Sequence, residues 1–200
     1  MHSVTRNHRP NHRHNHRRFL AAGAVLAVVL LLPLAGCGGD DAGTAPGSGT
    51  TGRDLSLAVD LYFPGDGTSL VPERRELAVS DDPEVQLRAL AEAVLAGPET
   101  PALHRPMPEG VELRAVYLTP SGVVYLDLAS PDEEAPPAGG SDQERLRVYS
   151  LVNTLLLNVA EADRAVVLWN GVQRTTFSGH LDLSRPLVPD TSLVARTEGG

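Results

Sequence analysis

The chain contains no lysine, and its charge distribution narrows the classes of partner that it can bind. All 17 basic residues are arginines, and five of them precede Cys37, whereas all 25 acidic residues follow it. The part of the chain after Cys37 therefore carries twelve arginines against 25 acidic residues, a net charge of −13. Because nucleic-acid affinity comes from clustered Lys and Arg on the phosphates, this composition argues against a nucleic-acid partner. It also argues against flat adsorption to anionic lipid.

The apolar run near the start of the chain is too short to cross a bilayer as a helix. It covers the sixteen residues 19–34 and is interrupted by Pro33, whereas a spanning helix needs about 20 apolar residues. A stretch rich in arginine and histidine precedes it, and Leu-Ala-Gly-Cys follows at 34–37. These are the cationic, apolar and small-residue parts of a secretory leader that ends in a bacterial lipobox.

Cys37, the only cysteine, is predicted to become the acylated first residue of a lipoprotein after removal of residues 1–36 as signal peptide. One acyl chain holds a protein only marginally, whereas the diacylglyceryl thioether supplies two chains and gives stable retention. We therefore expect a palmitate-type lipid anchor on the extracytoplasmic face of the cell membrane. Two other interpretations are weaker: an inert buried cysteine would not precede a polar linker, and Arg17-Arg18 lack the spacer usual in a twin-arginine export signal.

The rest of the chain divides into a tether and one domain. Residues 37–54 are rich in Gly, Ser, Thr and Asp and have no residue able to seed a core, which is typical of a flexible linker. Residues 55–195 have the usual length of a single domain.

Within this domain the hydrophobic pattern predicts an α+β fold. Alternating apolar residues at 55–63 predict a strand, and 69–79 an edge strand or extended arm. Asp82 can cap a helix that ends at Gly97, and a capping box of Ser141 and Glu144 opens a second. The remaining predicted strands are a hairpin at 111–118 and 123–129, and a buried strand at 165–169. This order is the split βαβ pattern, so we expect a largely antiparallel sheet of about five strands with two helices on one face.

The order and spacing of these segments resemble the GerMN domain family of sporulation and spore germination proteins of the GerM type. The resemblance spans about 57–190 and is carried by Leu61-Tyr62-Phe63, Leu70 to Leu77, Leu95-Ala96-Gly97-Pro98, Val123 to Ala129, Ser150 to Leu155 and Gly179 to Leu187. It implies one lipid-anchored, extracytoplasmic module with a fold related to the ring-building motifs of secretion and sporulation complexes. Such a module acts by protein contact and not by catalysis.

A search of the domain for catalytic or metal-binding residues gives little. Only His104 and His180 follow Cys37, so a zinc site would need both together with carboxylates, and no P-loop, nucleophile elbow or calcium loop is present. His180 and Asp182, near Ser178 and Ser184, form the one constellation that resembles a triad, but residues two apart on a strand do not touch reliably. Asn170 and Gly171 predict a turn after the strand at 165–169, and Trp169 is expected in the core or over this turn. The sequence thus predicts no catalytic, cofactor or metal site and no enzyme activity.

Two functions follow from this pattern. The first is a non-catalytic interaction or scaffold module of the bacterial cell envelope, with envelope proteins or a further copy of the chain as partners. The edge at 69–79 is its expected contact surface, with both Arg74 and Arg75 accessible. The alternative is a ligand-binding or cell-wall hydrolase accessory protein whose site combines His180, Asp182 and Trp169. It requires those three side chains to share one concave pocket.

Replacing Cys37 by serine should block lipidation, because a hydroxyl cannot form the thioether. Metabolic labelling with a fatty-acid analogue should mark the parent protein and leave the Cys37→Ser variant unmarked. Labelling of the serine variant, or no labelling of the parent, would contradict the predicted anchor.

Overall fold

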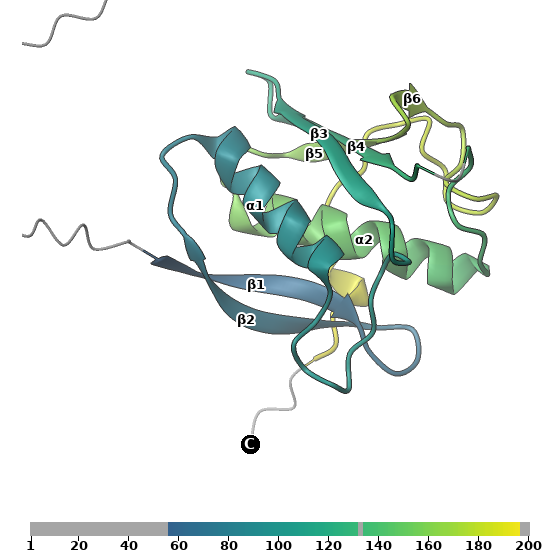
Figure 1. Ribbon diagram of the computed structural model, residues 1–200, viewed down its shortest axis with the longest axis horizontal. Coiled ribbons are helices and arrows are strands. Elements are labelled where there is room, and N and C mark those ends of the chain that lie inside the picture. Colours follow the sequence, from purple (N-terminus) through teal and green to yellow (C-terminus); the bar gives the residue numbers. More distant parts are fainter. Residues whose placement is uncertain (1–55, 132–133, 197–200) are drawn as a thin grey trace, which may run out of the picture. The chain divides into compact units, whose positions relative to one another are not determined.

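The computed structural model describes residues 56–131 and 134–196 (Figure 1). The predicted leader, Cys37 and the tether to residue 54 lie outside the described residues. The elements are, in chain order, β1 (Ser56–Pro64), β2 (Leu70–Ala78), α1 (Pro83–Ala96), β3 (Glu112–Leu118), β4 (Val123–Ala129), α2 (Ser141–Asn158), β5 (Arg164–Trp169), β6 (Val172–Gln173) and a 3₁₀ turn, η1 (Thr191–Leu193). Neither helix in this part of the chain has the length and apolar character needed to cross a membrane.

The strands form two sheets, and both helices lie between them. β1 and β2 make an antiparallel hairpin, whereas the second sheet has the order β3-β4-β5-β6. In Figure 1, α1 and α2 cover one face of the four-stranded sheet, and the hairpin packs against the other side of the helices. The predicted α+β class is confirmed, but the expected single sheet of about five strands is divided in two.

Side chains of α2 occupy the outer edge of β1 at Asp60 and Tyr62. The Tyr62 N–H donates to Thr154 Oγ1 at 3.0 Å, and the Asp60 N–H donates to Asn158 Oδ1 at 3.2 Å. The Asn158 amide returns a hydrogen bond to the Asp60 carbonyl at 2.9 Å. Helix side chains thus satisfy backbone groups that a neighbouring strand would otherwise pair with.

The first helix begins and ends as its sequence predicts. Asp82 accepts a hydrogen bond from the Glu84 N–H at 2.9 Å, and Pro83 occupies the first position, where its missing N–H costs nothing. Gly97 ends the helix with a φ of 92°, a conformation that favours glycine. Arg105 then donates from Nη1 to the free Leu95 carbonyl and from Nη2 to the free Ala96 carbonyl.

The four-stranded sheet is built from a hairpin and a parallel crossover. β3 and β4 are antiparallel, as predicted, and turn at Gly122 with a φ of 76°. β4 and β5 are parallel neighbours because the chain returns through α2 between them, which is the geometry of a βαβ unit. Asn170 and Gly171, both at positive φ, then join β5 to β6 in the two-residue turn that the sequence predicts.

One core joins all three layers. Its fully buried side chains come from the inner face of the hairpin, from both helices and from the inner face of the larger sheet; they include Leu61, Phe63, Leu87, Leu90, Leu126, Leu128, Leu151, Val152, Leu155 and Ala165. The apolar side chains of both helices therefore face the core, with Leu95 only partly buried.

Leu90→Asp and Val152→Asp should each unfold the domain, because both positions are completely buried and offer no partner for a carboxylate. An unpaired buried charge costs several kcal/mol, out of a total stability of about 5 to 15 kcal/mol. Thermal melting followed by circular dichroism measures the effect. Val85→Asp, on the exposed face of α1, is the control and should melt like the parent. A native melting temperature in either core variant would mean that the buried face is misassigned.

Candidate functional site

The β2 edge, defined here as the backbone of Pro72 to Ala78 on the side away from β1, is an unpaired strand edge. The N–H groups of Asp60 and Tyr62 bind α2 and so point away from β2. In an antiparallel pair, the residues opposite them must then point their backbone groups away from β1, and these residues are Arg74 and Pro72. The same alternation directs the backbone groups of Glu76 and Ala78 outward. Within the described residues these groups have no hydrogen-bond partner. Of the described residues, 194 and 195 cover the start of β2, where Leu70 pairs with Val194 and accepts from the Ala195 N–H.

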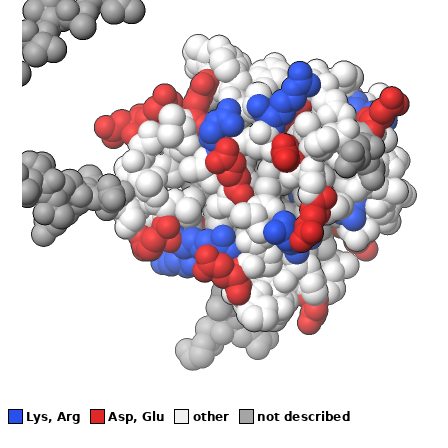
Figure 2. Space-filling model, viewed as in Figure 1, with Lys and Arg blue, Asp and Glu red and all other residues white. Residues whose placement is uncertain are grey.

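The outer face of the hairpin beside this edge carries charges of both signs. Arg74 is 71% exposed and pairs with Asp60 at 3.1 Å, and Glu76 is also exposed. Figure 2 shows arginine and acidic side chains side by side over the hairpin. Such a surface discourages indiscriminate strand pairing but leaves the edge open.

The inner face of β2 carries a buried ion pair. Arg75 is only 11% exposed; it donates to Glu73 and to the Gly97 carbonyl, and it lies 5.4 Å above the Phe63 ring. The expectation that Arg75 is accessible to a partner is therefore wrong. Because side chains on a strand alternate between its faces, Arg74 points to solvent and Arg75 inward.

Glu73 connects the hairpin to the segment after α1. Its carboxylate accepts hydrogen bonds from the Glu99 and Thr100 N–H groups, the latter at 2.7 Å. Burial alone would raise the pKa of Glu73, but the hydrogen bonds from Thr100, Glu99 and Arg75 outweigh it and lower the pKa to about 2. The carboxylate is thus ionised and structural.

A second buried carboxylate, Glu144, holds the loop at 175–183. The fully buried Glu144 side chain accepts from the N–H groups of Ser178, His180 and Leu181, and lies 2.8 Å from His180 Nδ1. Burial alone would raise its pKa, but these hydrogen bonds lower it to about 2. The predicted capping box is therefore wrong: Gly140 is the N-cap of α2, and Glu144 turns away from the helix start to the loop.

The three residues of the alternative site do not meet in one pocket. His180 is engaged by Glu144, while the exposed Asp182 accepts from the Ser184 N–H at 2.8 Å. Trp169 is 2% exposed and packs edge-on against Phe177, with ring centroids 6.1 Å apart. The small cavity beside Trp169 is lined by other residues, namely Pro108, Glu109, Val111, Ser130 and Pro137. The geometry gives no support to a ligand or hydrolase site there.

The two histidines of the domain are also separate from each other. His104 lies 3.3 Å from Asp66, and His180 contacts Glu144. No cluster of three or more potential metal ligands is present among residues 56–131 and 134–196.

Comparison with known proteins identifies the domain. Residues 60–175 match the family model described as "Germane: Sporulation and spore germination". The chain belongs to the Germane, or GerMN, family. No match was found among curated protein sequences.

Solved structures agree with this assignment at the level of the fold. The first GerMN domain of the sporulation protein GerM from Bacillus subtilis is 18% identical, with a TM-score of 0.53 over 66% of this chain and 97% of that one. The tandem GerMN domains of the same protein are 17% identical, with a TM-score of 0.53 over 67% of this chain and 46% of that one. This chain therefore spans about half of the tandem structure.

Sequence reasoning missed the residues that organise this Germane domain. Glu144, Thr154 and Asn158 bind the backbone of distant segments, and these contacts leave no local pattern in the sequence. One signal was available: polar residues interrupt the apolar stripe of α2, and buried polar groups need partners.

The two low pKa values predict an acid-sensitive fold. A carboxylate with a pKa of about 2 when folded and 4.5 when unfolded contributes about 3 kcal/mol above pH 4.5, which is lost as the pH falls toward 2. Glu144→Gln should lower the unfolding free energy at pH 7 by about 1 to 3 kcal/mol and reduce its fall below pH 5.

Denaturant unfolding at pH 7, 5, 4 and 3 measures both effects. Glu92→Gln, which replaces an exposed carboxylate on α1, is the control and should keep the pH dependence of the parent. An unchanged pH dependence in Glu144→Gln would contradict the assigned role of this carboxylate.

Proposed function

We propose that this Germane domain is a lipid-anchored, extracytoplasmic and non-catalytic interaction module of the bacterial cell envelope. Its family is one of sporulation and spore germination. The lipobox at 34–37 and the tether that follows support attachment to the outer face of the membrane. On this proposal the tether keeps the domain near the membrane while leaving it free to reach a partner.

The observation that carries the proposal is the open β2 edge. Its outward N–H and C=O groups are arranged to accept a further strand, a mode of recognition in which main-chain hydrogen bonds supply affinity. The opposite edge of the hairpin cannot serve, because Thr154 and Asn158 already occupy it. Within the hairpin, pairing is thus directed to the outer side of β2.

The side chains around the edge make pairing selective. Pro72 offers a carbonyl but no N–H, so a partner strand forms its ladder with Arg74, Glu76 and Ala78. The exposed Arg74 and Glu76 side chains then favour a partner that places complementary charges opposite them. The partner is an envelope protein with an extended segment of this kind.

The buried charged residues argue for this role over catalysis. Glu73 and Glu144 are both ionised and both saturated with hydrogen bonds from backbone N–H groups. A general acid or base instead has a pKa near the operating pH and a free approach to its substrate.

Glu76→Pro should abolish partner binding without unfolding the domain, because proline removes an outward N–H and none of the hydrogen bonds to β1. The matched control is Glu76→Ala, which loses the same side chain but keeps the N–H. A photocrosslinking amino acid at Arg74 in native membranes, followed by mass spectrometry, measures contact. We expect one discrete adduct that falls at least about tenfold in Glu76→Pro and persists in Glu76→Ala.

Two results would count against strand addition. Equal adduct yields from the proline and alanine variants would show that the outward N–H is not used. A crosslinker at Val85, on the exposed face of α1, should give no such adduct, and the same adduct from that position would place the partner elsewhere. An adduct with a second copy of the chain would replace the envelope partner by self-association.

A further inference from the structure

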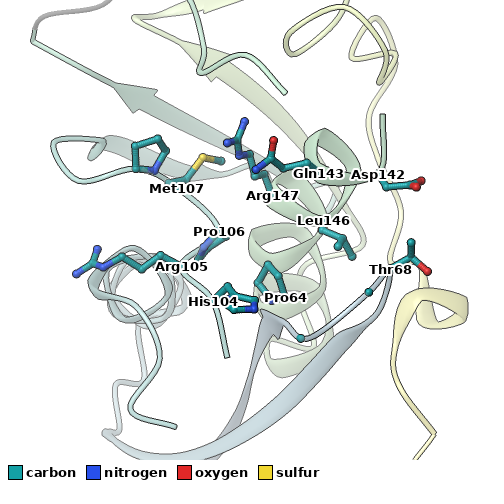
Figure 3. Close-up of a pocket in the computed structure, with 13 residues that line it drawn as sticks. Pro64, Thr68, His104, Arg105, Pro106, Met107, Asp142, Gln143, Leu146 and Arg147 are labelled. Atoms are coloured by element: carbon teal, nitrogen blue, oxygen red, sulfur yellow. The ribbon is translucent and has the colours of Figure 1, made fainter. Parts of the chain in front are cut away.

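A cavity of about 620 Å³ opens at the turn between β1 and β2, next to Pro64 at the end of β1. Three segments line this α2 cavity: the turn between β1 and β2, residues 104–108, and the first two turns of α2 (Figure 3). The His104 N–H donates to the Pro64 carbonyl at 2.8 Å and so holds two of these segments together. The volume lies within the range of about 300 to 1,000 Å³ that is typical of small-molecule sites.

The floor of the α2 cavity is apolar and buried. Met107 is 2% and Leu146 6% exposed, and Pro64, Gly65 and Pro106 are buried beside them. These five residues have no side-chain hydrogen-bonding group apart from the weakly accepting methionine sulfur. An apolar group placed on this floor would leave water without losing a hydrogen bond.

The rim is polar, with more positive than negative groups. Thr68, His104, Arg105, Gln143 and Arg147 lie around the opening, together with one carboxylate, Asp142. Figure 3 shows Arg147 and Gln143 extending from α2 toward Met107, while Asp142 lies on the side of Thr68. The balance is opposite to that of the chain after Cys37, in which acidic residues outnumber arginines about two to one.

Arg147 is the rim cation best placed to receive an anion. Its Nη1 donates to the carbonyls of Pro137 and Ala138 at 3.0 and 2.9 Å, and its Nε and Nη2 have no hydrogen-bond partner among residues 56–131 and 134–196. No ion pair of Arg147 occurs within the described ranges. Partial burial lowers the pKa of Arg147, and the nearby Glu144 carboxylate opposes that shift. Arg105, by contrast, uses both of its Nη atoms on the end of α1.

We propose that the α2 cavity binds a small amphiphile, with an apolar body on the floor of Pro106, Met107 and Leu146 and one anionic head group at Arg147. The head group is a carboxylate or a phosphate, since a guanidinium binds either through parallel N–H donors. The α2 cavity contains no residue of the β2 edge, so each proposal can be tested without the other.

A photoreactive ten-carbon fatty acid tests the site on the full-length lipoprotein in vesicles of phosphatidylcholine, which is zwitterionic and has no net charge. The labelled peptides are mapped by mass spectrometry, and labelling should concentrate on residues 104–108 and 142–147. Decanoate and decyl phosphate should each compete, and their relative potency identifies the preferred head group. Decanol and decyltrimethylammonium should compete at least about tenfold less well. Equal competition by decanol, or labelling spread evenly over the domain, would overturn the proposal.

Variants distinguish binding in the α2 cavity from nonspecific binding of the fatty acid to the protein surface. Thr68→Trp places a bulky ring at the exposed rim without touching the core and should abolish labelling. Arg147→Gln should remove the preference for decanoate over decanol, whereas Arg147→Lys should keep it. Arg88→Gln, an exposed arginine of α1 outside the cavity, is the matched control and should behave as the parent.

Thermal melting of each variant identifies any that have unfolded, and Thr68→Trp and Arg147→Lys keep the test decisive if Arg147→Gln fails to fold. Unchanged labelling in a folded Thr68→Trp protein would overturn the proposal. Glu76→Pro should bind the fatty acid normally, so loss of strand pairing and loss of the amphiphile site are distinguishable.

Discussion

Buried backbone N–H groups need acceptors, and α2 supplies them to three other parts of the domain. Thr154 and Asn158 serve the outer edge of β1, Glu144 serves the loop at 175–183, and Asn153 exchanges two hydrogen bonds with the backbone of Asp190. The apolar side of the same helix fills the core. The positions of these three segments relative to α2 therefore depend on polar side chains as well as on hydrophobic packing, which by itself is not directional.

The α2 side chains on the β1 edge determine which edge of the hairpin remains open to a partner strand. A hairpin with two free edges could pair on either side, and helix side chains close one of them. On the proposed function, the hairpin offers one open strand edge at a surface where charges and Pro72 limit uncontrolled association. The division into two sheets is thus the structural basis of the proposed interaction site.

The charged residues of the domain divide into two groups with different tasks. Glu73 and Glu144 are buried, ionised and bound to backbone donors, so their charge stabilises loops. Arg74, Glu76 and the rim of the α2 cavity remain exposed or partly exposed and available to other molecules. This separation leaves exposed charged side chains at both of the proposed recognition surfaces.

The sequence by itself determined the α+β class, the main helices and strands, and the turn at Asn170-Gly171, because periodicity, caps and turn residues act over a few positions. It also predicted the edge character of β2 and the lipobox at Cys37, which lies outside the described residues. Only the tertiary structure decided that the strands form two sheets, that Arg75 is buried beside Glu73, and that Glu144 binds a loop 34 to 37 residues away. The α2 cavity likewise joins three segments distant in sequence. Such contacts are set by which surfaces meet when the core forms, and no local pattern records them.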